Sequence, residues 1–118
     1  MRVTSGRDQP WRIELSTEVD QWLDGLPVRG QAQALRALDL LVEHGPALRL
    51  PHSRKLDDQL WELRFRCERV NQRITYTVEP ERHIITLTTF RKQRDNERRE
   101  VQRARTVLRR HRNRGDSR

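Results

Sequence analysis

The stretch that decides the fold runs from residue 60 to residue 92 and contains three strand-like segments: Leu60-Trp61-Glu62-Leu63-Arg64-Phe65-Arg66, Arg73-Ile74-Thr75-Tyr76-Thr77-Val78 and Ile84-Ile85-Thr86-Leu87-Thr88-Thr89-Phe90. In the first two segments apolar residues alternate with polar ones, and the third is rich in β-branched residues, as is typical of β-strands. Short polar breaks at residues 67–72 and 79–83 indicate hairpin turns. The stretch therefore predicts an antiparallel sheet with one apolar face and one solvent-exposed face that carries Arg64, Arg66 and Arg73.

The flanking sequence completes a compact α+β domain of the order β-α-α-β-β-β-α. Residues 11–15 alternate like a short strand, and residues 16–26 form an expected helix that Ser16 or Thr17 caps. Residues 28–44 carry a helical apolar stripe that ends at Gly45-Pro46, so the two helices are expected to form a hairpin over one face of a mainly antiparallel sheet. Residues 47–59 are expected to be a linker and residues 96–111 a last, basic helix. The pattern leaves open whether the first strand joins the sheet at an edge or beside a central strand.

The domain boundaries follow from composition. We expect a flexible N-terminus at residues 1–10, a single domain at residues 11–112 and a frayed basic tail at residues 113–118. Cys67 is the only cysteine, which excludes a disulfide framework, and no apolar run is long enough to span a membrane. Without a signal-peptide pattern, the chain is expected to be cytoplasmic.

Positive charge is concentrated at the end of the chain. Residues 1–90 hold equal numbers of basic and acidic residues, whereas residues 91–118 hold 12 basic and 4 acidic ones and account for the net charge of +8. A neutral body with a cationic end favours a polyanionic partner, of which nucleic acid is the commonest. The alternative is a basic helix and tail that serve only solubility.

The candidate site is a cluster of basic residues on the exposed sheet face. Arg64 and Arg66 are two residues apart on one strand and thus point to the same side, and Arg73 can approach from the next strand. Arginine matches phosphate oxygens with two parallel hydrogen bonds. The alternative is that these arginines only solubilise the sheet and that Glu62 pairs with one of them.

Other catalytic patterns are missing from the sequence. It contains neither a glycine-rich phosphate loop nor a Gly-x-Ser-x-Gly elbow. The four histidines are far apart in sequence and are expected to lack carboxylate neighbours, so no metal site is predicted.

The runs Leu60-Trp61-Glu62-Leu63-Arg64, Arg73-Ile74-Thr75-Tyr76 and Phe90-Arg91-Lys92, preceded by Lys55-Leu56, resemble the RelE/HigB superfamily of toxins from type II toxin–antitoxin systems. The phage-derived Gp49-like, HigB-type branch is the most similar, and the resemblance extends over residues 11–108. It implies a RelE-like domain that cleaves mRNA on the ribosome without metal or other cofactor. The chemistry that the resemblance implies is attack of the substrate's own 2′-hydroxyl on the adjacent phosphate. It also implies a cognate antitoxin, typically a helix-turn-helix protein of the HigA type, and no membrane partner.

The resemblance also assigns roles to residues. Arg64 and Arg73 are expected to stabilise the phosphate and Lys92 to bind it or transfer a proton, which makes these three the expected catalytic set. The residues expected to bind RNA are Lys55, Arg66, Arg91 and Arg94. The segment after Lys92 has no tyrosine, unlike that of some family members, and arginine is a poor base. The general acid and base therefore stay open, and so do a ParE-like inhibitor of gyrase, an inactive antitoxin-binding relic and a general RNA-binding module that uses the arginine-rich helix.

Overall fold

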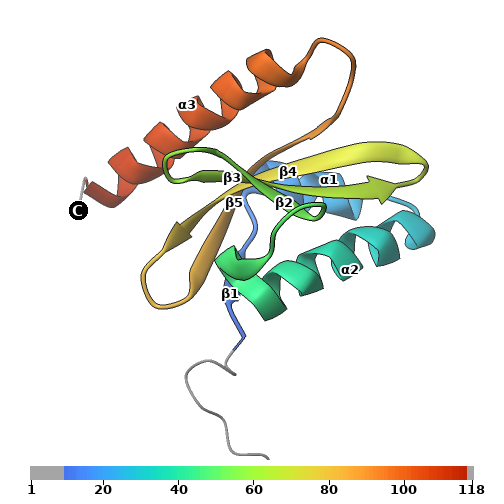
Figure 1. The fold of residues 1–118 in the computed structure, drawn as a ribbon, viewed down its shortest axis with the longest axis horizontal. Coiled ribbons are helices and arrows are strands. Elements are labelled where there is room, and N and C mark those ends of the chain that lie inside the picture. Colours follow the sequence, from blue (N-terminus) through green and yellow to red (C-terminus); the bar gives the residue numbers. More distant parts are fainter. Residues whose placement is uncertain (1–9, 117–118) are drawn as a thin grey trace, which may run out of the picture.

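The predicted sheet forms the middle layer of the protein, with helices on both of its sides (Figure 1). The structure is a computed structural model and describes residues 10–116, so the predicted flexible N-terminus lies almost entirely outside the described residues. The elements are β1 (Arg12–Glu14), α1 (Thr17–Asp24), α2 (Val28–His44), a 3-10 turn (Gly45–Ala47), β2 (Ser53–Asp57), β3 (Leu60–Cys67), β4 (Val70–Glu79), β5 (His83–Arg91) and α3 (Glu97–Asp116).

The five strands lie in the order β1-β5-β4-β3-β2. Strands β2 to β5 pair antiparallel with their neighbours, and β1 pairs parallel with β5. The prediction of an α+β domain with a mainly antiparallel sheet is confirmed. The structure also answers the question that the sequence left open, because β1 lies at an edge.

One strand was not predicted. Residues 53–57, expected to belong to a linker, form β2 and pair with β3 at the second edge of the sheet. This segment holds one apolar residue, Leu56, among polar and charged ones. Charged edge strands are common because charge discourages pairing with other chains, and they lack the apolar signal of central strands.

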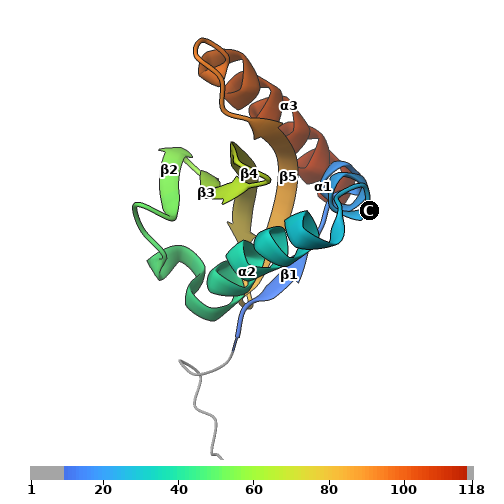
Figure 2. The ribbon, with the colours of Figure 1, turned by 90° about the vertical axis from the view of Figure 1, so that its right-hand side faces the viewer.

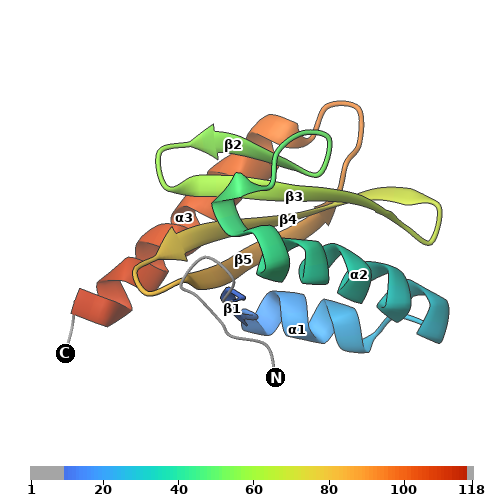
Figure 3. The same cartoon turned by 60° about the horizontal axis from the view of Figure 1, so that its bottom comes forward.

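The helical hairpin α1–α2 packs on one face of the sheet, as predicted (Figure 3). Ser16 caps α1 by accepting a hydrogen bond from the backbone N–H of Val19, and it donates another to the carbonyl of Leu87. The core of this face is built from Val19, Ala37, Leu38, Leu41, Leu63, Ile74, Tyr76 and Ile84. We call it the hairpin face.

The opposite face is covered in part by α3, which corrects the prediction of a solvent-exposed face (Figure 2). A second, smaller core lies under the helix and consists of Leu60, Ile85, Leu87, Ala104 and Leu108. The apolar stripe of α3 is stable only when it is buried against other apolar residues. Strand β5 has apolar side chains on both faces of the sheet, so α3 can pack on the face that the hairpin leaves open. We call this second face the α3 face. Helix α3 also runs on to Asp116, beyond its predicted end at His111.

The tight turn after α2 gives one testable prediction. Gly45 has a φ of +55° and a ψ of −140°, and a Cβ placed on it would lie 2.4 Å from the Trp11 ring. Gly45→Ala is therefore expected to lower the free energy of unfolding by about 2–3 kcal/mol, from backbone strain and from displacement of Trp11. The control is Gly25→Ala, at a φ of −79° with its nearest neighbours 3.6 Å away, which is expected to change stability by less than about 0.5 kcal/mol. Urea unfolding of both variants measures the difference, and equal stability would contradict the prediction.

Candidate functional site

Arg64 and Arg73 lie side by side on the α3 face. They are direct cross-strand partners of β3 and β4, so their side chains leave the sheet on the same side. The Arg64 guanidinium is half-buried and forms neither an ion pair nor a hydrogen bond with any residue in the range 10–116. The pairing of two arginines across neighbouring strands concentrates positive charge at one point of the sheet.

A buried carboxylate lies next to this pair. Glu62, two residues before Arg64 on β3, is only 1% exposed. Its Oε1 lies 3.7 Å from Nε of Arg73, and its Oε2 lies 3.2 Å from Nη2 of Arg54 on the neighbouring strand β2. Neither oxygen has a hydrogen-bond partner among the described residues, and the same holds for Nε of Arg54 and of Arg73. Three adjacent strands thus contribute charged groups to one cluster.

The surroundings shift the protonation equilibria of this cluster. Burial raises the pKa of the Glu62 carboxyl above its usual range, although Arg54 and Arg73 oppose the shift. Burial also lowers the pKa of Arg73; Glu62 opposes that shift and Arg64 adds to it. An ionised carboxylate without hydrogen bonds is costly to bury, since paired charges rarely recover their full desolvation cost. The cluster therefore is not arranged for maximal stability.

The burial of Glu62 and Arg73 was not predicted. Arg73, expected on an exposed face, is only 7% exposed, and its guanidinium lies beside the buried carboxylate of Glu62. The sequence also left open that Glu62 pairs with one of the arginines. The structure shows such pairing, because Glu62 contacts both Arg54 and Arg73. Outward alternation on a strand predicts which side a residue faces and not whether another element covers that side.

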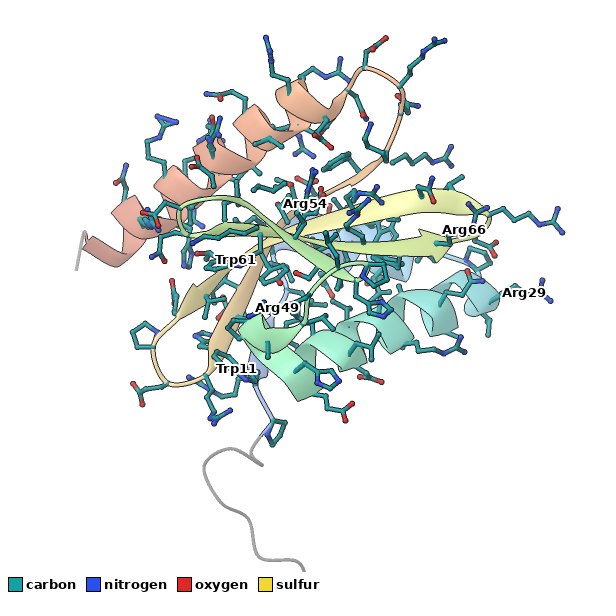
Figure 4. The ribbon with its side chains drawn as sticks, viewed as in Figure 1. Trp11, Arg29, Arg49, Arg54, Trp61 and Arg66 are labelled. Carbon is teal, nitrogen blue, oxygen red and sulfur yellow. The ribbon has the colours of Figure 1, made fainter. Side chains whose placement is uncertain are left out.

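Lys92 and Arg66 lie at the end of the sheet beyond this cluster. The backbone N–H of Lys92 donates to the carbonyl of Asn71, the residue that pairs with Arg66 across β3 and β4. Lys92 Nζ donates to the carbonyl of Gln93, and the Arg66 guanidinium donates to Asn71 and to the carbonyl of Arg69. Arg66 reaches outward at the tip of the β3–β4 hairpin (Figure 4). Lys92 therefore lies at the same end of the sheet as the Arg64–Arg73 pair.

The other predicted RNA-binding residues are more scattered. Lys55 lies on the hairpin face, with Nζ 5.3 Å from the centre of the Trp61 ring. Arg91 follows Phe90, the cross-strand partner of Arg73, so by alternation it points away from Arg73. Arg94 is exposed in the loop before α3. The structure does not bring Lys55 or Arg91 to the face of the arginine pair.

Sequence reasoning missed Arg54 because it missed β2. Arg54 pairs directly with Glu62 in the β2–β3 register, which places it on the α3 face (Figure 4). The segment 53–57 has no apolar–polar alternation, and the only local signal was the short Asp58-Gln59 turn before β3. With β2 recognised, Arg54 would have joined the predicted cluster.

A second polar cluster corrects the expectation that the histidines lack carboxylate neighbours. His83 contacts Glu14 at 3.3 Å and Glu79 at 3.7 Å, and Nε2 of His111 lies 2.7 Å from Oε2 of Glu79. These contacts connect β1, the β4–β5 turn and the far half of α3 around a cavity of about 760 Å³. Within residues 10–116, no three such side chains are arranged to hold a metal ion.

A helical hairpin on one face of a small, mainly antiparallel sheet matches the RelE-like domain that the resemblance implies. The match to family models places the chain more narrowly. The model of the phage-derived Gp49-like protein family (DUF891) matches residues 21–110, and the chain belongs to this family. No curated protein matches the chain in sequence. Over the described part of the chain, no helix has the length and apolar character needed to cross a bilayer.

Proposed function

We propose that this protein is the toxin of a type II toxin–antitoxin system and inhibits translation by cleaving mRNA on the ribosome. Family membership supports the toxin class. The observation that supports the endonuclease reading most is the Arg64–Arg73 pair, which offers two guanidinium groups on one side of the sheet, with Lys92 at the end of the same sheet.

The chemistry that suits this arrangement is transfer of a phosphate ester within the RNA. The substrate's 2′-hydroxyl loses its proton and attacks the adjacent phosphorus, the bond from phosphorus to the 5′-oxygen breaks, and that oxygen receives a proton. Negative charge builds up on the phosphate oxygens during the attack. Fixed guanidinium groups that contact these oxygens stabilise the transition state more than the ground state. Arg64 and Arg73 are the residues proposed to do so.

Lys92 is proposed to bind the phosphate or to transfer a proton. Its ammonium group donates to the Gln93 carbonyl in the loop before α3, and the side chain is half-buried. In the proposed role this ammonium group exchanges the Gln93 carbonyl for a phosphate oxygen of the RNA. The cytoplasm, where ribosomes and mRNA are found, is the proposed location.

The test is controlled expression of the toxin gene in a bacterium, followed by mapping of RNA ends. The expected result is growth arrest and cut transcripts with a 2′,3′-cyclic phosphate upstream and a 5′-hydroxyl downstream. Purified toxin and intact ribosomes, in a buffer that contains the magnesium which ribosomes require, are expected to give the same ends. Linearised plasmid and intact transcripts would instead indicate a gyrase-directed toxin of the same fold. Normal growth with intact RNA would overturn both readings.

A further inference from the structure

Arg54 lies between two carboxylates of very different exposure. Its Nη2 is 3.2 Å from Oε2 of buried Glu62 and 3.0 Å from Oε1 of Glu97, which is 42% exposed in the first turn of α3. Its Nε is buried and has no hydrogen-bond partner among the described residues. Arg54 thus contacts a buried carboxylate on its inner side, while its hydrogen-bonded ion pair with Glu97 on the solvent side is open to exchange with another anion.

The side of Arg54 that faces solvent opens into a groove between β2 and α3. The groove has a volume of about 440 Å³ and is lined by Arg54, Lys55, Leu56, Glu97, Arg98, Val101 and Arg105. Of its two nearby carboxylates, Glu97 contacts Arg54, and Asp57 contacts Arg105 at 2.7 Å. Arg98 is exposed and has no ion pair within the described range. An anionic chain in this groove meets excess positive charge, with Arg54 at its inner wall.

Glu62 connects this groove to the Arg64–Arg73 pair. It lies on the strand between Arg54 and Arg73 and contacts both guanidinium groups, yet accepts a hydrogen bond from neither. Replacing buried ion pairs with apolar residues often leaves stability unchanged or raises it, so stability alone gives a weak reason for this arrangement. An anion between two guanidinium groups of like charge, by contrast, offsets their mutual repulsion and favours their staying close together.

We propose that Arg54 is a further phosphate-binding residue of the RNA site, and that Glu62 is the positioning residue that holds Arg54 and Arg73 together. The inference rests on the proposed function, because RNA is the ligand. In the free protein the Glu97 carboxylate occupies the solvent side of Arg54, and an RNA phosphate replaces it on binding.

The first test measures binding alone. The probe is a 2′-O-methyl RNA hexamer, which lacks the attacking hydroxyl and cannot be cleaved. Arg54→Ala is expected to weaken the affinity of the protein for this hexamer by about tenfold. It is also expected to reduce the slope of log affinity against log salt concentration by about one. The matched control is Arg49→Ala, which removes the same charge from an exposed position outside this groove (Figure 4), and is expected to change affinity by less than about twofold. Equal losses in both variants would overturn the role of Arg54.

The second test separates positioning from simple charge. Glu62→Gln and Glu97→Gln each remove one negative charge beside Arg54 and are therefore matched in charge. Glu97→Gln is expected to bind the hexamer at least as tightly as wild type, whereas Glu62→Gln is expected to bind it more weakly because Arg54 loses the partner that holds it. Single-turnover cleavage is expected to fall by about tenfold or more in Glu62→Gln only, because Arg54 and Arg73 lose their common partner. Glu97→Gln is expected to cleave as fast as wild type. Similar cleavage rates in the two variants would overturn the role of Glu62.

Two further measurements keep the result clear. Thermal unfolding shows whether Glu62→Gln is folded. If it is not, Glu62→Asp replaces it in the test, because this variant keeps the charge but moves the carboxylate back by one methylene group. The expected loss of cleavage rate in Glu62→Asp is smaller. Should wild type cleave no RNA, the proposed function fails while hexamer binding still tests Arg54. If wild type cleaves RNA and Arg54→Ala binds the hexamer normally, the inference fails and the function stands.

Discussion

Arg73→Ala is expected to lower the single-turnover rate constant for RNA cleavage by about 10²- to 10³-fold, the usual loss when one fixed hydrogen-bond donor to a transition-state anion is removed. Arg73 is buried beside Glu62, and its Nη1 donates to the Gln72 carbonyl, so its guanidinium is fixed before substrate arrives. Such preorganisation is what makes the donor effective. In cells, the same substitution is expected to remove growth arrest.

Two variants control this experiment. Arg73→Lys keeps the charge but loses the fork of parallel donors, and it is expected to retain intermediate activity. Arg29→Ala removes an equal charge from an exposed site at the start of α2 (Figure 4) and is expected to reduce the rate by less than about twofold. Because Arg73→Ala leaves Glu62 with one ion-pair partner fewer, rates are compared below the unfolding temperature of every variant. A full rate in Arg73→Ala would remove Arg73 from the mechanism.

Leu41→Ala is expected to lower the free energy of unfolding by about 3–5 kcal/mol. Leu41 is fully buried in the core of the hairpin face, where α2 packs on β3. Truncation to alanine removes apolar contacts and leaves a cavity that rigid neighbours on the sheet cannot fill. Urea unfolding measures the loss of stability. If the slope of the unfolding free energy against urea concentration is the same in the variant and in wild type, the two proteins expose similar surface on unfolding and their free energies can be compared.

The control for this prediction lies on the same helix. Leu35 is 49% exposed, so Leu35→Ala changes the same side-chain type in the same helix with little burial at stake. It is expected to cost less than about 1 kcal/mol. Equal losses at the two positions would mean that α2 does not pack on the sheet through Leu41.

The sequence predicted the hairpin face well because each signal there is local. The apolar stripe of residues 28–44 and the Gly45-Pro46 stop give the bounds of α2 to the residue. The alternation at Trp61, Leu63 and Phe65 predicts β3, and the Ser16 cap predicts the start of α1. Helix periods, caps and strand alternation depend on neighbours within a few residues and can be read from one chain.

The α3 face was predicted less well because its burial depends on how distant elements pack. Arg73 and Glu62 alternate like exposed residues, yet both are buried in a cluster that draws on three strands. The pairing of Arg64 with Arg73 followed from the hairpin register and was within reach of sequence reasoning. The place of Arg54 was not, since it depends on an edge strand with a single apolar residue.

The parallel pairing of β1 with β5 has a consequence for the order in which the chain folds. Arg12 pairs with His83, and the Ser16 hydroxyl reaches Leu87, 71 residues further along. The turns between β3, β4 and β5 close short loops, whereas closing the loop between β1 and β5 costs more entropy. During synthesis β1 can therefore take its place in the sheet only after β5 has been made. A nascent chain that ends before β5 leaves β1 without its neighbouring strand, and Ser16 without the Leu87 carbonyl to which it donates.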